Sequence, residues 1–193
     1  MYLKNITIKE DFRNLKKGHK IELLTLTLLV GEQGCGKSSL LSLIQDNNID
    51  FTPLPLLQNK EINTYFFDSE KMNPRILDLD DFVNPDGTNK GIGVSGSVLS
   101  HFKSHGEILR EYTVNSIKKA KNCILILDEP ESALSLKNQY KLANELKKAE
   151  KNNVQTIIAT HCLPLIESVE KVYSLQTNEW ISSKEFIENS KNY

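Results

Sequence analysis

The sequence is poor in cysteine and contains no long apolar run. Its three cysteines, Cys35, Cys123 and Cys162, show no paired spacing, which argues against a disulfide framework or a zinc site and favours a reducing compartment. No apolar run approaches the length that spans a membrane, and the N-terminal residues lack the apolar core of a signal peptide. We therefore expect a cytoplasmic protein without a membrane partner.

Arginine is also scarce, and neither sign of charge is in excess. The 193 residues carry a formal net charge of −1, so the overall charge does not require nucleic acid as a partner. Arg13, Arg75 and Arg110 are the only arginines, and the lysine-rich stretch 118–121 is more typical of a solvated face than of a DNA groove. Hydrophobic residues make up 39%, which is ordinary for a soluble protein, and we expect residues 1–193 to form a single domain.

The most specific feature is a glycine-rich stretch at residues 31–38, which fits the pattern G-x-x-x-x-G-K-[ST]. Glycines let the backbone adopt positive φ, so that its N–H groups and the start of the next helix can hold a polyphosphate. The pattern requires a buried strand before it and a helix after it, and residues 23–30 and 37–46 predict both. Lys37 is expected to reach the β- and γ-phosphates, and Ser38 to ligate Mg²⁺. The expected nucleotide contacts are Gly31, Glu32, Gln33, Gly34, Cys35, Gly36, Lys37, Ser38 and Ser39.

Strands and helices are predicted to alternate along the chain. The predicted strands are 2–8, 62–67, 123–127, 154–160 and 172–175, and the predicted helices are 104–121, 136–152 and 182–187. In the helix 136–152 we expect Ser135 at the N-cap and one apolar face that carries Leu136, Tyr140, Ala143 and Leu146. Continuous apolar strands are typical of parallel sheets. We expect an α/β fold of the P-loop NTPase type, with a mostly parallel central sheet flanked by helices and a loop-rich subregion at about 68–106.

Two adjacent carboxylates end the apolar strand 123–127. An acidic residue in this position holds Mg²⁺ through water in proteins with a phosphate loop, so we assign Asp128 to the metal together with Ser38. Glu129 is poised to activate the attacking water and is the expected general base. His161 follows the next apolar strand, and from the same edge of the sheet it is expected to sense the γ-phosphate.

Two further segments allow two interpretations each. Asp68 and Glu70 follow the strand 62–67 and could either contact the metal or its water, or form a plain turn. The residues Ser-His-Gly-Glu at 104–107 have the spacing of a helix capping box. A serine at a helix N-terminus is equally suited to hydrogen-bond a γ-phosphate, and the two interpretations of 104–107 are compatible.

These motifs, in this order, resemble those of the ABC-type ATPase superfamily. Residues 31–38, 104–107, 127–134 and 159–161 look like its Walker A, signature, Walker B with D-loop, and switch-histidine motifs. The signature resembles the soluble branch of small stand-alone ATPases, with SMC-like and overcoming-lysogenization-defect ATPases as wider relatives. The resemblance implies a head-to-tail homodimer that sandwiches two ATP molecules. In that dimer Ser104 and Gly106 of one subunit would complete the nucleotide site of the other.

The sequence departs from the superfamily in three ways. The insertion between the phosphate loop and the signature is very small, with no coiled coil, so arms that could span DNA are absent. No glutamine stands at the expected Q-loop, which leaves Asp68 or Glu70 as stand-ins. Ser135 occupies a place where transporter D-loops usually have aspartate.

The expected function is Mg²⁺-dependent ATP binding and hydrolysis that drives or regulates a partner protein. A nuclease in DNA repair or phage defence would resemble the partners of relatives, and nucleic acid is a further candidate. One alternative is a regulatory module that binds ATP with little hydrolysis. Another is a P-loop kinase acting on a small molecule, which would typically need a lid with arginines, whereas Arg75 alone lies between the strand 62–67 and the signature.

Overall fold

The structure is a computed structural model of the 193-residue chain. It describes residues 2–13, 15–45, 49–53, 63–68, 114–115, 117–132 and 134–191. The expected signature residues Ser104, His105, Gly106 and Glu107 lie outside the described residues, as do Glu70 and most of the subregion 68–106.

The larger of two sheets has six strands in the order β5-β6-β7-β3-β8-β9. They are β5 (Asn63–Asp68), β6 (Cys123–Asp128), β7 (Val154–Ala159), β3 (Leu26–Val30), β8 (Lys171–Ser174) and β9 (Glu179–Ser182). The first five are parallel, and β9 pairs antiparallel with β8. The mostly parallel sheet is therefore confirmed, and the carboxyl ends of its parallel strands meet at one edge.

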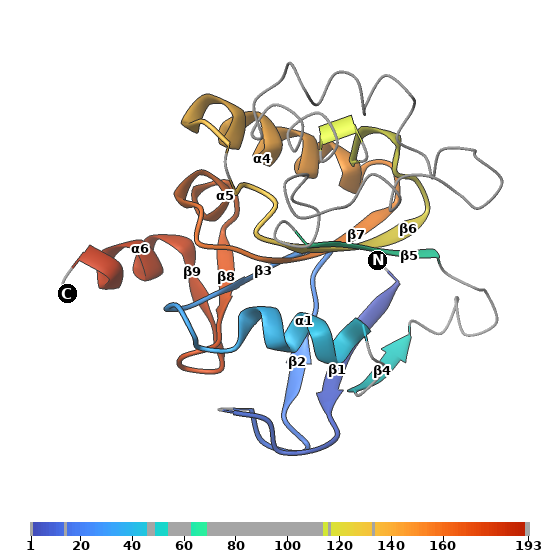
Figure 1. The fold of residues 1–193 in the computed structure, drawn as a ribbon, viewed down its shortest axis with the longest axis vertical. Coiled ribbons are helices and arrows are strands. Elements are labelled where there is room, and N and C mark those ends of the chain that lie inside the picture. The colour runs from blue at the N-terminus through green and yellow to red at the C-terminus, as the bar shows by residue number, and fades with distance from the viewer. Residues whose placement is uncertain are drawn as a thin grey trace, which may run out of the picture.

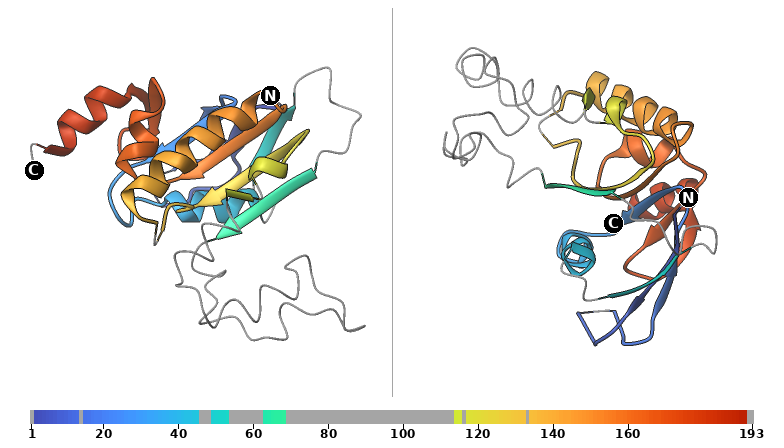
Figure 2. Two further views of the ribbon diagram at one scale, coloured as in Figure 1. Left: turned by 90° about the horizontal axis from the view of Figure 1, so that it is seen from above. Right: turned by 90° about the vertical axis from the view of Figure 1, so that its right-hand side faces the viewer.

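Helices cover both faces of this sheet (Figure 1). In the described residues they are α1 (Lys37–Gln45), α4 (Leu136–Glu150), α5 (Leu163–Glu167) and α6 (Ser183–Lys191). Helix α1 lies on one face, whereas α4 and α5 lie on the other, and α6 extends outward toward the C-terminus (Figure 2). None of the helices in the described part of the chain is long and apolar enough to cross a membrane.

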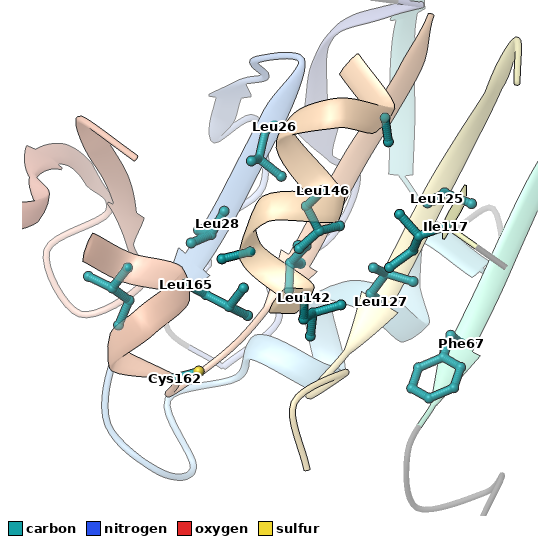
Figure 3. Close-up of a cluster of buried hydrophobic side chains, with 14 of the residues drawn as sticks. Leu26, Leu28, Phe67, Ile117, Leu125, Leu127, Leu142, Leu146, Cys162 and Leu165 are labelled. Carbon is teal, nitrogen blue, oxygen red and sulfur yellow. The ribbon is translucent and has the colours of Figure 1, made fainter. Parts of the chain in front are cut away.

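The sheet has an apolar core on each face, because neighbouring residues of a strand point to opposite sides. On the α4 side, Leu28 belongs to a buried cluster with Leu142, Leu146 and Leu165, which Figure 3 shows together. On the α1 side, Leu29 belongs to a second cluster with Leu40, Ile44 and Ile157. Burial on both faces explains why the strand sequences are continuously apolar.

A smaller antiparallel sheet packs beside α1, with the strand order β2-β1-β4. Its strands are β1 (Leu3–Ile8), β2 (Lys20–Glu22) and β4 (Ile49–Pro53). The fully buried Gln155 of β7 joins the two sheets. Its Oε1 accepts hydrogen bonds from the N–H groups of Tyr2 (2.8 Å) and Leu3 (2.7 Å), and its Nε2 donates to the carbonyls of Leu3 (2.9 Å) and Leu24 (3.1 Å).

The predicted apolar face of α4 is confirmed for Ala143 and Leu146, which are buried together with Leu142 and Ala149. It was wrong for Leu136 and Tyr140, which are 63% and 46% exposed. Periodicity selects a helix face, but it does not show which turns of that face are covered, and the Tyr140 hydroxyl instead donates to Oε2 of Glu167 in α5 at 3.1 Å. Ser135 stands at the N-cap as expected, although its side chain makes no capping hydrogen bond.

Candidate functional site

The phosphate loop joins the carboxyl end of β3 to the start of α1. Its glycines Gly31, Gly34 and Gly36 have φ angles of 147°, 80° and 106°, which L residues rarely adopt. A Cβ atom on Gly31 would lie only 2.7 Å from the Sγ atom of Cys35, so this position also requires glycine for space. Successive N–H groups in such a loop form a concave site for anions. The residues Glu32 and Gln33 are exposed, and Ser39 is half-buried in the first turn of α1.

Lys37 is almost fully buried within this loop, with 5% exposure. Its Nζ atom donates to the carbonyl oxygens of Gly31 and Glu32, each at 3.0 Å, and lies 3.8 Å from the Sγ atom of Cys35. The loop therefore folds around the ammonium group that is expected to meet the phosphates.

The two expected magnesium ligands contact each other. The Oγ atom of Ser38 donates to Oδ1 of Asp128 at 3.1 Å, which links the start of α1 to the end of β6. Asp68 ends the neighbouring strand β5 directly in register with Asp128, so the structure places Asp68 beside the expected metal site. Hydroxyl and carboxylate oxygens are the ligands that Mg²⁺ prefers, and Mg²⁺ takes the rest of its shell from water and phosphate. The described residues hold no cluster of three or more His, Cys, Asp or Glu side chains that could hold a metal ion.

Glu129 and His161 meet at the same edge of the sheet. The His161 Nε2 atom lies 3.6 Å from Glu129 Oε1, and the two side chains are 43% and 44% exposed. Glu129 has a φ of 44°, a left-handed conformation that is strained for a residue other than glycine, and its N–H donates to the carbonyl of Ala159 at 2.9 Å. The strained turn after β6 therefore holds the carboxylate next to β7 and the histidine.

The pKa of His161 is lowered from its ordinary value of 6.5. Desolvation is the largest cause, and the positive charge of Lys37 adds to it, whereas the negative charge of Glu129 opposes it. The imidazole is therefore neutral at pH 7. Lys37 and Glu129, which come from two other motifs, are thus both close enough to His161 to act on its charge.

Two residues that were not predicted from the sequence contact this site. Arg13, in the connection between β1 and β2, donates from Nη1 to the carbonyl of Gly34 at 3.2 Å. Glu131 is buried, and its Oε1 atom accepts hydrogen bonds from the Thr160 hydroxyl and from the N–H of His161. The scarcity of arginine could have drawn attention to Arg13, whereas no sequence pattern distinguished Glu131 from the carboxylates beside it.

A hollow lies beside the phosphate loop and extends toward α6. Its lining includes Glu32 and His161 from the site, Gln176 and Thr177 from the turn after β8, and Phe186 from α6. No lysine or arginine is among the described residues that line it.

Residues 118–166 match the family described as "AAA domain, putative AbiEii toxin, Type IV TA system". This stretch contains Asp128, Glu129 and His161. A "putative export ATP-binding/permease protein" of Rickettsia typhi is 28% identical over 200 residues, which cover 85% of this chain and 34% of the relative. The chain thus spans about a third of the length of that curated relative.

Solved structures with the same arrangement include transporter ATPases and an SMC head. A structure described as "a putative metal-chelate type ABC transporter" in an inward-facing conformation matches with a TM-score of 0.60 and 19% identity over 95% of this chain and 84% of its own. The protein cbiO1 from Clostridium perfringens, part of an ABC transporter complex, matches with 0.55 and 15% over 98% and 92%. The SMC head domain from Thermotoga maritima matches with 0.56 and 12% over 90% and 94%. The chain has the P-loop fold that ABC-type ATPases and the SMC head share.

Proposed function

We propose that this chain binds Mg-ATP and hydrolyses it. The observation that carries the proposal is the convergence of Lys37, the Ser38–Asp128 contact and the Glu129–His161 pair at the carboxyl edge of one sheet. Ligands of open parallel α/β sheets bind at this edge. A phosphate loop, two hard oxygen ligands and a free carboxylate are together the groups that nucleotide hydrolysis requires.

Each residue has a defined task in this proposal. The loop N–H groups and Lys37 hold the β- and γ-phosphates, and Ser38 and Asp128 hold Mg²⁺, which neutralises the phosphate charge when bound. Glu129 orients the attacking water and accepts its proton. The neutral His161 carries one ring N–H, with which it donates a hydrogen bond to the γ-phosphate. Arg13 supports the loop from outside through Gly34.

We further propose that two copies close on the nucleotide head to tail. The Glu129 and His161 side chains are each more than two-fifths exposed, and a reacting site gains when water is excluded from it. Ser104 and Gly106 of the second copy would cover this open side, as the resemblance of 104–107 to a signature motif implies. The free thiols of Cys35, Cys123 and Cys162 are consistent with a cytoplasmic location.

We also propose what the ATP cycle does: it drives or regulates a partner protein. A partner protein such as a nuclease, acting in DNA repair or phage defence, would respond to opening and closing of the dimer. Residues 118–166 match a family whose description names a type IV TA system, which suggests such a setting but names no partner. No observation in the described residues favours a small-molecule kinase: Arg13, the one arginine among them, lies in the connection between β1 and β2 and contacts the phosphate loop at Gly34.

The test combines ATP binding and phosphate release in two variants. Lys37→Ala should weaken ATP binding about 100-fold, since it removes a buried charge-assisted contact. Glu129→Gln should keep ATP binding but lower the hydrolysis rate by about 10²–10⁴-fold, and should accumulate as an ATP-bound dimer in sedimentation runs. Glu150→Gln, an exposed change at the end of α4, is the matched control. Hydrolysis by Glu129→Gln at the wild-type rate would contradict the assignment, and a binding module without hydrolysis would show no effect of Glu129 on dimer formation.

A further inference from the structure

Glu131 lies where the two halves of the site meet. It follows Glu129 by two residues, in the turn after β6, and only 8% of it is exposed. Its Oε1 atom accepts one hydrogen bond from the Thr160 hydroxyl and a second from the N–H of His161, at 3.2 Å. Residues 160 and 161 directly follow β7, so a single carboxylate oxygen joins the turn that carries Glu129 to the segment that carries His161.

Thr160 extends this link by one more hydrogen bond. Its Oγ1 atom accepts from the N–H of Cys162 at 2.9 Å, while its own proton goes to Glu131. The hydroxyl of Thr160 and the N–H groups of His161 and Cys162 therefore depend, directly or through one step, on the Glu131 carboxyl. This fixes the backbone of the histidine on both sides of its Cα atom.

Burying the Glu131 carboxyl in this turn costs free energy of folding. Its Oε2 atom is buried and has no hydrogen-bond partner among the described residues. Burial raises the pKa of this carboxyl, and the negative charge of Glu129 contributes to the same direction. A buried polar atom without a partner destabilises a fold, so such an atom calls for an explanation other than stability.

We propose that Glu131 is a positioning residue that holds His161 against Glu129 in the site described above. The inference rests on the proposed ATPase function and adds a residue to it. Glu131 acts through the main chain of His161 and through Thr160, not through the imidazole itself. Without its oxygen, the 3.6 Å approach of the His161 ring to Glu129 is no longer maintained.

Two substitutions separate the hydrogen bonds of Glu131 from its charge. Glu131→Ala removes the acceptor, and because small errors of placement are costly in catalysis, kcat should fall about 10–100-fold with KM changed by less than about 3-fold. Glu131→Gln keeps an oxygen that can accept both hydrogen bonds, and it should restore kcat to within about 3-fold of the wild type. The conservative variant also guards against a simple loss of folding in Glu131→Ala.

The matched control is Gln155→Ala. This change also removes a buried polar side chain, but at the start of β7, which is the end away from Thr160 and His161. Rates per folded molecule should fall in Glu131→Ala and not in Gln155→Ala. The second measurement is amide hydrogen exchange by NMR without nucleotide, in which the N–H groups of His161 and Cys162 should lose protection in Glu131→Ala and regain it in Glu131→Gln.

The two measurements keep this inference distinct from the proposed function. An unchanged kcat in Glu131→Ala, an equal loss in Gln155→Ala, or unchanged exchange at His161 would overturn the inference. If the wild type releases no phosphate, the proposed function fails, and the exchange experiment still decides whether Glu131 holds the His161 segment.

Discussion

The two ends of β7 are each tied to the rest of the molecule by one buried polar side chain, and the two ties differ in kind. At the start of the strand, Gln155 uses both atoms of its amide in four hydrogen bonds to the main chain. Beyond its end, Glu131 bonds Thr160 and His161 through one oxygen while the other has no partner in the described residues.

We interpret this difference as one of role: the Gln155 amide stabilises the fold, whereas the Glu131 carboxyl positions the His161 segment. The oxygen of the neutral Gln155 amide accepts from two N–H groups, and its nitrogen donates to two carbonyls. Both polar atoms of this buried amide are therefore paired. The Glu131 carboxyl can only accept when it is ionised, and it lies near the negative charge of Glu129. Of these two groups, the Gln155 amide, far from the site, is thus fully paired, whereas the Glu131 carboxyl, beside the site, tolerates an unfavourable environment.

The largest effect on stability is expected from Gln155→Ala. The change removes the partner of the Tyr2 and Leu3 N–H groups and of the Leu3 carbonyl, whereas the Leu24 carbonyl keeps its hydrogen bond from the Thr27 hydroxyl. Each unpaired buried group costs about 1–3 kcal/mol. The free energy of unfolding in urea should fall by about 3 kcal/mol or more. Gln139→Ala, which removes one hydrogen bond to the Leu134 carbonyl, should cost less than about 1.5 kcal/mol. Equal losses in the two variants would show that the Gln155 amide contributes no more to stability than a side chain with one hydrogen bond.

The next largest effect is the pH dependence of folding stability that the Glu131 carboxyl causes. Its folded-state pKa is raised above the ordinary 4.5, so the folded protein binds this proton more tightly than the unfolded chain does. Ionisation of Glu131 therefore destabilises the fold above the folded pKa, and this cost disappears as the pH falls through that pKa toward 4.5.

The comparison that isolates this effect is between the wild type and Glu131→Gln. As the pH is lowered from 7.5 toward 4.5, the unfolding free energy of the wild type should rise relative to the variant, by at most about 1.4 kcal/mol per pH unit. The difference is measured by urea unfolding at several pH values. A difference that stays constant, or that moves the other way, would show that the carboxyl carries no such cost.

The smallest effect is expected at His161, which is half exposed. Its pKa lies below 6.5, so its contribution to stability is complete above pH 6.5 and is lost as the pH falls from 6.5 to the folded pKa. Glu129 raises this pKa and Lys37 lowers it. In an NMR titration of the imidazole, Glu129→Gln should therefore lower the midpoint further, and Lys37→Ala should raise it. A midpoint at or above 6.5 in the wild type would contradict the described electrostatics.

The part of the site that follows a local pattern could be predicted from the sequence. The phosphate loop, Asp128, Glu129 and His161 lie at strand ends, and strand ends of a parallel sheet meet at one edge. The contacts of Arg13 with Gly34 and of Glu131 with Thr160 join residues 21 and 29 positions apart, and no periodicity encodes them. The connection between Tyr2 and Gln155 spans 153 positions and depends on how the two sheets pack.

Some strands and helices were also not predicted, because their sequences carry no clear local pattern. β4 ends at Pro53, which reads as a breaker, but β4 is an edge strand in which a missing N–H group is tolerated. The strands β2 and β9 have three and four residues, and α5 has five, which is too short for a periodic signal.

The most direct test of the account is the Mg²⁺ dependence of phosphate release from ATP, measured in the wild type and in Asp128→Asn. We propose that Ser38 and Asp128, whose Oγ and Oδ1 atoms lie 3.1 Å apart, hold the metal of one ATP site. Release should therefore require Mg²⁺ in the wild type and should be lost in Asp128→Asn while the variant stays folded. Release that continues in Asp128→Asn, or that proceeds without a divalent cation, would contradict it.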